Sequence, residues 1–272
     1  MESKFVELNG LNYHYLEIPN AGKPKVLLVH GIIVESHYWE SVMQVLAPHF
    51  HVFSIDLKGH GLSDSGKSYL EDYTTEKIAQ DFYDFYQKVL KEPFHLVGYS
   101  LGGQFSMEYA AQYGSTLKSF VIVDSAHALS LKGVFALMLA DIITPKVFAN
   151  LDAIKKFYPA SLGEYMAHYT VKQREDGKYI LKFDRKNISP KSLSEGMRRN
   201  KRLWKCITQI KTPTLILRAG KSRILSAKTM KNINLAIPQS QTAEIPDVGH
   251  EFVFTMGEAV GNKLKDFFNQ HP

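Results

Sequence analysis

A serine that could act as a nucleophile stands in the stretch FHLVGYSLGGQFSMEYA, residues 94–110. An apolar run is followed by GYSLG (98–102) and then by a helical pattern, which is the arrangement of a G-x-S-x-G elbow. In such an elbow the serine occupies a strained turn that exposes its hydroxyl, and the glycines let strand and helix approach closely. The first N–H groups of the helix point toward a developing oxyanion. The pattern predicts Ser100 as the nucleophile.

A histidine base and a second oxyanion donor are also needed. His250, in IPDVGHEF, follows the last expected strand, at 241–245, in a loop that can reach back to the serine. In VLLVHGIIVESHYW, His30 and a glycine directly follow another apolar run, and the next residue can supply an N–H opposite the elbow. We therefore assign the oxyanion hole to the N–H groups of Ile32 and Leu101, and expect His30 to brace its loop.

The elements that position these residues form a strand–helix alternation. Apolar runs predict strands at 25–29, 51–55, 94–98, 120–123, 214–218 and 241–245. Helical patterns lie near 37–46, 75–91, 101–113, 227–235 and 256–269. The first residues, FVELNGLNYHYLEI, predict a hairpin that turns at Asn9-Gly10. This order predicts an α/β fold with a mainly parallel sheet covered on both faces.

The alternation breaks after residue 125. Residues 126–205 contain helical patterns and a predicted hairpin that turns at Asp176-Gly177. We expect this segment to be a mainly helical cap at the carboxyl end of the sheet, where α/β folds place their sites. The core would then consist of residues 1–125 and 206–272.

Together with SIDLKGHGLSD (54–64), these motifs resemble the α/β-hydrolase superfamily. The resemblance covers residues 4–125 and 210–270. It implies a mostly parallel eight-stranded sheet with a cap inserted after the sixth strand. It also implies that Asp56 and Asp64 stabilise loops.

The resemblance raises one difficulty, the acid that orients the histidine. In most of the superfamily the acid follows the strand after the cap, three residues beyond a glycine. Here Arg223 stands at that position, after Gly220, and a guanidinium cannot orient an imidazolium. Asp124 ends the neighbouring strand, where some members, including a branch of the haloalkane dehalogenases, place the acid. We favour Asp124.

Other interpretations of the acid stay open. An aspartate in this position also caps turns in members that keep the usual acid. Asp247 is only three residues before His250 and is expected to point away, and Glu35 is a weaker alternative near the oxyanion loop. If Asp124 is not the acid, the site is a Ser–His dyad or has lost catalysis.

A serine nucleophile favours ester hydrolysis through an acyl-enzyme. Dehalogenases and epoxide hydrolases of the superfamily use an aspartate at that position. No His, Cys or Asp cluster has the spacing of metal ligands and no nucleotide-binding loop appears, so we expect no metal and no cofactor. Two rivals remain: a ligand-binding protein with little turnover, and a carbon–carbon bond hydrolase that uses the same Ser–His pair.

We expect the substrate to contact Tyr99 beside the nucleophile, Phe135 and Met138 on an apolar stretch of the cap, and Arg223 at the pocket mouth. The apolar stretch could equally pack on the core.

The charge distribution indicates an anionic partner. Residues 126–205 hold 16 Lys and Arg against 7 Asp and Glu, within a chain of net charge +6. The stretch RRNKRLWK (198–205) would suit a small anionic ester or an acidic acyl carrier protein, as in the pimeloyl-carrier methyl ester esterases, which the chain resembles in size and motifs. The same charge would also serve as a solubilising surface.

Other features argue against nucleic acid and membrane. The basic residues come without a recognition motif for nucleic acid. The longest apolar stretch, at 133–143, is interrupted by Asp141 and is too short to span a bilayer. The chain starts without the apolar region of a signal peptide, and Cys206 has no partner for an internal disulfide. We expect a cytoplasmic protein.

Overall fold

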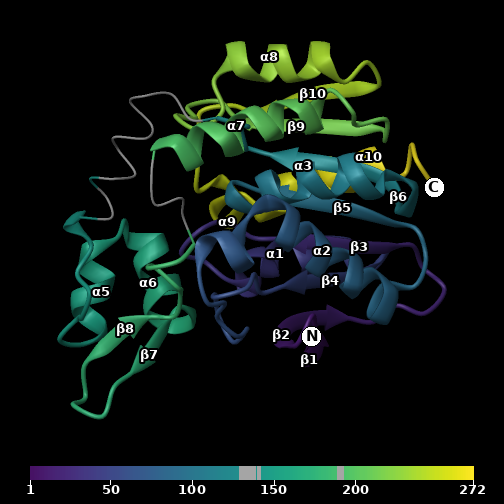
Figure 1. The fold of residues 1–272 in the computed structure, drawn as a ribbon. Helices are drawn as coiled ribbons and strands as arrows, with labels where there is room; N and C mark the ends of the chain where they lie inside the picture. The colour runs from purple at the N-terminus through teal and green to yellow at the C-terminus, as the bar shows by residue number, and fades with distance from the viewer. Residues whose placement is uncertain (129–138, 140–141, 189–192) are drawn as a thin grey trace.

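The computed structural model describes residues 1–128, 139, 142–188 and 193–272. Among them, eight strands form one sheet in the order β1-β2-β4-β3-β5-β6-β9-β10 (Figure 1). The strands are β1 (Glu2–Leu8), β2 (Leu11–Ile18), β3 (Lys25–Val29), β4 (His51–Ile55), β5 (Phe94–Tyr99), β6 (Leu117–Val123), β9 (Thr214–Ala219) and β10 (Ser240–Ile245). Only β1–β2 and β2–β4 are antiparallel, and the other pairs are parallel. The predicted mostly parallel eight-stranded α/β fold is confirmed.

Both faces of the sheet are buried because alternate side chains of each strand enter different cores. In β3, Val26 and Leu28 pack in one hydrophobic cluster, whereas Leu27 and Val29 pack in the other. The first cluster is covered by α1 (Glu40–Leu46) and α10 (Gly257–Phe268). The second is covered by α2 (Thr75–Phe85), α3 (Leu101–Tyr113), α7 (Leu193–Ile207) and α8 (Ala227–Ala236).

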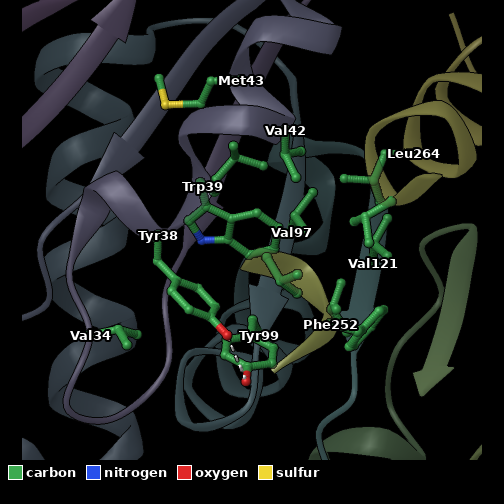
Figure 2. Packing of buried hydrophobic residues seen from close by; sticks show 14 of the residues in the cluster. Val34, Tyr38, Trp39, Val42, Met43, Val97, Tyr99, Val121, Phe252 and Leu264 are labelled. Carbon is green, nitrogen blue, oxygen red and sulfur yellow. Dashed lines mark hydrogen bonds between the residues drawn. The ribbon is translucent and has the colours of Figure 1, made fainter. Parts of the chain in front are cut away.

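The core beneath α1 is rich in aromatic side chains. Figure 2 shows Trp39 and Tyr38 packed over Tyr99, with aliphatic residues of β5, β6 and α10 around them. Trp39 is fully buried, and its ring meets that of Tyr99 edge-on at 6.3 Å between centroids. The apolar core therefore reaches the carboxyl end of β5, directly below the predicted nucleophile.

The segment between β6 and β9 carries α5 (Leu151–Phe157), α6 (Ala160–Tyr169) and the short hairpin β7–β8 (Val171–Gln173 and Tyr179–Leu181). Figure 1 shows these elements grouped beside one end of the sheet, whereas α7 lies along α3. Arg202 of α7 forms two hydrogen bonds to the buried Glu108 of α3. The end of the inserted segment thus packs on the sheet layer, and the division into core and cap stays a prediction.

Of the helices that the structure describes, none is both long enough and apolar enough to cross a membrane.

Candidate active site

The predicted nucleophile sits where β5 turns into α3. Ser100 has φ 52° and ψ −119°, a left-handed conformation that few non-glycine residues adopt. The turn is crowded: a Cβ on Gly98 would lie 2.7 Å from the Cα of Gly103, and one on Gly102 would lie 2.3 Å from the His30 carbonyl oxygen. Only glycines allow this approach, so the strained serine is fixed by its surroundings.

Two further contacts hold the turn from β6. The Ser100 N–H donates to the Val123 carbonyl at 3.0 Å, which extends the pairing of the two strands beyond β5. The Ser125 hydroxyl donates to the Ser100 carbonyl at 2.6 Å. Sequence analysis did not identify Ser125. The signal that could have identified it is its position directly after Asp124, at the end of a predicted strand.

The structure brings His250 between Ser100 and Asp124. The His250 Nε2 lies 3.0 Å from the Ser100 Oγ, and its Nδ1 lies 2.7 Å from the Asp124 Oδ2. Since the carboxylate can only accept, Nδ1 carries the proton and Nε2 accepts from the serine hydroxyl. This is the geometry in which a histidine can remove the serine proton while a carboxylate fixes its tautomer.

Asp124 is fully buried, with a left-handed φ of 43° that turns its side chain toward β9. Its carboxylate accepts two further hydrogen bonds, from the Ser222 Oγ at 2.7 Å and from the Ala219 N–H at 3.2 Å. The charge is therefore satisfied by three donors, as a buried carboxylate requires. Ser222 was missed by sequence reasoning, although it stands next to Arg223, the usual acid position.

The other acid candidates lie elsewhere. Asp247 is exposed and pairs with Lys221 at 3.3 Å, so it points away from His250 as expected. Glu35 is buried but accepts from the Tyr165 hydroxyl at 2.8 Å. Neither makes a hydrogen bond to His250 among the described residues.

Tyr99 lies buried beside the candidate base. Its side chain is buried between Tyr38 and His250. Figure 2 shows Tyr38 beside it. On the other side, its ring stacks on that of His250 with 4.9 Å between the ring centroids. Its hydroxyl donates to the His250 carbonyl at 2.9 Å. Burial raises its pKa well above the ordinary value, so the hydroxyl keeps its proton. The expectation that Tyr99 contacts substrate stays a prediction; the contacts of its buried ring are with the histidine loop.

The loop after β3 approaches the elbow closely. A Cβ on Gly31 would lie 3.1 Å from that of Ser100. The Ile32 and Leu101 N–H groups donate to no atom of the described residues, so both are available to an oxyanion. His30 is buried, its Nε2 accepts from the Leu57 N–H at 2.9 Å, and burial lowers its pKa. It connects two loops.

Asp56 and Asp64 also connect loops. The buried Asp56 accepts from the Ser36 N–H at 2.7 Å and contacts His14 Nδ1 at 2.8 Å. Burial alone would raise its pKa, but the hydrogen bond with His14 and the nearby His30 lower it to about 2. Asp64 accepts from the Asn12 N–H at 2.8 Å. Both carboxylates are thus tied to backbone away from Ser100.

Of the three other residues expected to contact substrate, the structure describes one. Phe135 and Met138 lie outside the described residues. Arg223 is exposed on the loop after β9, and its side chain has no partner among the described residues. A hollow of about 220 Å³ lies beside the histidine loop, lined by Pro159, Leu162, Val248, Gly249, Glu251, Phe252 and Thr255. Ser100 is not part of its wall. Among the described residues no group of three or more His, Cys, Asp or Glu could hold a metal ion.

Comparison with known proteins agrees with this fold. The family model of the alpha/beta hydrolase fold matches residues 24–255, so the chain belongs to that family. It is 28% identical over 251 residues to Lipase 1 of Psychrobacter immobilis, covering 87% of this chain and 74% of the lipase. It is 34% identical over 119 residues to the N-formylmaleamate deformylase of Pseudomonas putida, 44% of this chain and 43% of that one. The crystal structure of E-2-(acetamidomethylene)succinate hydrolase superposes with a TM-score of 0.86 at 21% identity, covering 98% of this chain and 99% of the other, which shows the fold alone.

Proposed function

We propose that the protein is a serine hydrolase that cleaves a carboxylic ester of a small molecule through an acyl-enzyme on Ser100. One observation carries the proposal: the ring of His250 is hydrogen-bonded to both Ser100 and Asp124. The buried carboxylate supports this assignment, because an acid at Asp124 removes the need for one at Arg223.

The reaction would proceed in two steps. His250 takes the Ser100 proton while Oγ attacks the ester carbonyl, and the N–H groups of Ile32 and Leu101 stabilise the oxyanion. The histidine then gives the proton to the leaving alcohol, and an acyl group remains on Ser100. A water activated by His250 attacks this acyl group, and the acid is released as the serine recovers its proton.

Asp124 would act without exchanging a proton. Its carboxylate keeps the His250 proton on Nδ1 and stabilises the imidazolium that forms in each step. The Ser222 hydroxyl and the Ala219 N–H hold the carboxylate beside the ring. Tyr99 holds the histidine from below through its stacked ring and its bond to the His250 carbonyl.

The comparisons support a hydrolase at the family level, and the lipase relative favours ester substrates. The deformylase relative matches over less than half the chain. It favours, as a second possibility, a substrate with a small acyl group. The carrier protein that the basic stretch suggested gains no support from these relatives, so we propose a small ester. A ligand-binding protein loses its main argument, the missing acid at Arg223.

Hydrolysis of p-nitrophenyl butyrate tests the proposal, with Ser100→Ala as the matched blank. Turnover by the wild type that the variant lacks supports a serine hydrolase. Wild-type release of p-nitrophenol no faster than that of Ser100→Ala, on this ester and on the acetate and octanoate analogues, contradicts it.

A further inference from the structure

The loop between β3 and η1 (Ser36–Trp39), which carries the proposed oxyanion donor Ile32, is strained. Ile33, directly after it, has a φ of 62°, and a β-branched residue rarely adopts this left-handed conformation. Such a conformation persists only where the surrounding structure holds it. On one side, Gly31 packs against the Ser100 turn. The other side of the loop therefore also needs an anchor.

That anchor comes from the segment inserted between β6 and β9. The Tyr165 hydroxyl, on α6, accepts a hydrogen bond from the Glu35 N–H at 3.1 Å and donates one to Glu35 Oε1 at 2.8 Å. Both residues are buried. Burial and the adjacent Glu35 carboxylate raise the pKa of Tyr165 well above its ordinary value, so the hydroxyl stays a donor at neutral pH. One hydroxyl thus fixes the backbone and the side chain of Glu35, three residues after Ile32.

Glu35 passes this restraint to the start of η1. Its Oε1 also accepts from the His37 N–H at 3.1 Å, and its Oε2 lies 2.9 Å from the His37 Nδ1. The Ser36 N–H donates to Asp56 at 2.7 Å, so the chain beyond Glu35 is tied to the core. Within the described residues, the Glu35 N–H has no acceptor other than Tyr165. Without the hydroxyl this buried N–H would lose its partner, and the loop would move to regain one.

The ring of Tyr165 packs independently of its hydroxyl. It meets the ring of Tyr38 edge-on with 5.5 Å between the centroids, and its centroid lies 5.2 Å from that of Phe254. Tyr38 in turn stacks on Tyr99 (Figure 2). These ring contacts hold α6 on the core without the hydroxyl. Replacing Tyr165 by phenylalanine therefore removes the hydrogen bonds and keeps the packing.

From these contacts we infer that Tyr165 is a positioning residue for the oxyanion hole: its hydroxyl holds the loop where the Ile32 N–H meets the oxyanion. The inference rests on the proposed ester hydrolysis for its reaction. Tyr165 acts through Glu35 and not on the reacting atoms. Since the bond from Ile32 strengthens as the oxyanion forms, its misplacement affects kcat more than KM.

Hydrolysis of p-nitrophenyl butyrate by Tyr165→Phe tests the inference. The variant should lose about 10- to 100-fold in kcat with KM nearly unchanged, the effect of a displaced oxyanion donor. The pKa that appears in kcat/KM reports the base of the free enzyme and should stay at its wild-type value, because the hydroxyl bonds to Glu35 and not to His250. Tyr169→Phe is the matched control, since Tyr169 lies one turn later on α6 and its hydroxyl donates to Glu40 in α1 at 3.2 Å. It should change neither kcat nor KM.

Two variants of Glu35 approach the same hydrogen bond from the other side. Glu35→Gln can still accept from the Tyr165 hydroxyl through its amide oxygen and should keep most of kcat. Glu35→Ala has no side-chain acceptor and should lose kcat as Tyr165→Phe does. Equal activity of the two Glu35 variants would contradict the role of this bond.

Propyl trifluoromethyl ketone separates the oxyanion hole from substrate binding. Ser100 Oγ adds to its carbonyl carbon, the C=O π bond opens to an oxyanion, and the serine proton passes to His250. Since this adduct places its oxyanion in the hole, Tyr165→Phe should weaken inhibition by the same factor as it lowers kcat/KM. Inhibition as tight as in the wild type, or a rise in KM in place of the fall in kcat, would overturn the inference.

Amide hydrogen exchange of residues 31–37 distinguishes a failed inference from failed ester hydrolysis. Exchange in this segment should be faster in Tyr165→Phe than in the wild type or in Tyr169→Phe. If the wild type neither hydrolyses the ester nor binds the ketone but this difference is found, Tyr165 holds the loop and the proposed hydrolysis fails. Unchanged exchange overturns the inference, and the proposed hydrolysis still stands if the wild type turns over the ester. A thermal midpoint for each variant excludes general unfolding as the cause.

Discussion

Replacing Asp124 by asparagine should nearly abolish turnover, because an amide cannot satisfy the donors around the carboxylate. Oδ2 accepts from His250 and Ser222, and Oδ1 accepts from the Ala219 N–H. Whichever way the amide is turned, its NH₂ group faces a donor. With NH₂ toward His250 the ring proton moves to Nε2, which can then no longer accept from Ser100.

The expected loss in kcat for Asp124→Asn is about 10⁴-fold, close to 5.5 kcal/mol in the activation free energy. The assay is steady-state hydrolysis of p-nitrophenyl butyrate. Asp247→Asn is the matched control, because that aspartate is only three residues before His250 in sequence but is exposed and paired with Lys221. The reasoning is refuted if Asp124→Asn keeps more than about a tenth of the activity, or if Asp247→Asn loses as much.

Three further outcomes follow from the described contacts. Ser222→Ala removes one donor from the buried carboxylate and should lower kcat about 10-fold with KM unchanged; an unchanged kcat would deny that Ser222 orients the acid. Arg202→Met leaves Glu108 buried without its cation and should cost roughly 2 kcal/mol in urea unfolding, whereas the exposed Lys201→Met should cost almost nothing; equal effects would contradict the ion pair. Burial lowers the pKa of His95 from 6.5 to about 3, so as pH falls the unfolded chain binds the proton before the folded protein does. The free energy of unfolding should therefore decrease below pH 6.5, by about 1.4 kcal/mol per pH unit from this group. Urea unfolding at pH 7, 6 and 5 measures this dependence: His95→Gln should remove the contribution, and the same pH dependence in wild type and variant would refute it.

Much of the fold could be predicted because its signals are local. The apolar runs, the Asn9-Gly10 turn and the glycines around Ser100 report on neighbours in the chain, and the structure has strands and turns at these places. The family model agrees with the resemblance drawn from the motifs.

The candidate acid was harder to predict because its partner is remote in sequence. Asp124 and Ser222 meet only because β6 and β9 are adjacent in the sheet, with the whole inserted segment between them in the chain. No local pattern encodes that adjacency, so Asp247 and Glu35 could not be dismissed from spacing alone. The structure separates these candidates by distance and exposure.

Two further side chains could not be placed from the sequence. Tyr99 neighbours the nucleophile in sequence, but side chains alternate along a strand, so it points into the aromatic core below His250. Arg202 was one cation in a basic stretch, and it pairs with the buried Glu108 while its neighbour Lys201 stays exposed. Charge counting cannot distinguish two adjacent cations of which one pairs with a buried carboxylate and the other is exposed.

Labelling with a fluorophosphonate tests the central claim most directly, since this reagent forms a stable adduct with a serine that its own site has activated. The account predicts one phosphonyl group per chain, mapped by peptide mass spectrometry to Ser100, absent from Ser100→Ala and strongly slowed in Asp124→Asn. Wild-type protein that stays unlabelled, or that carries the adduct on a residue other than Ser100, would contradict it.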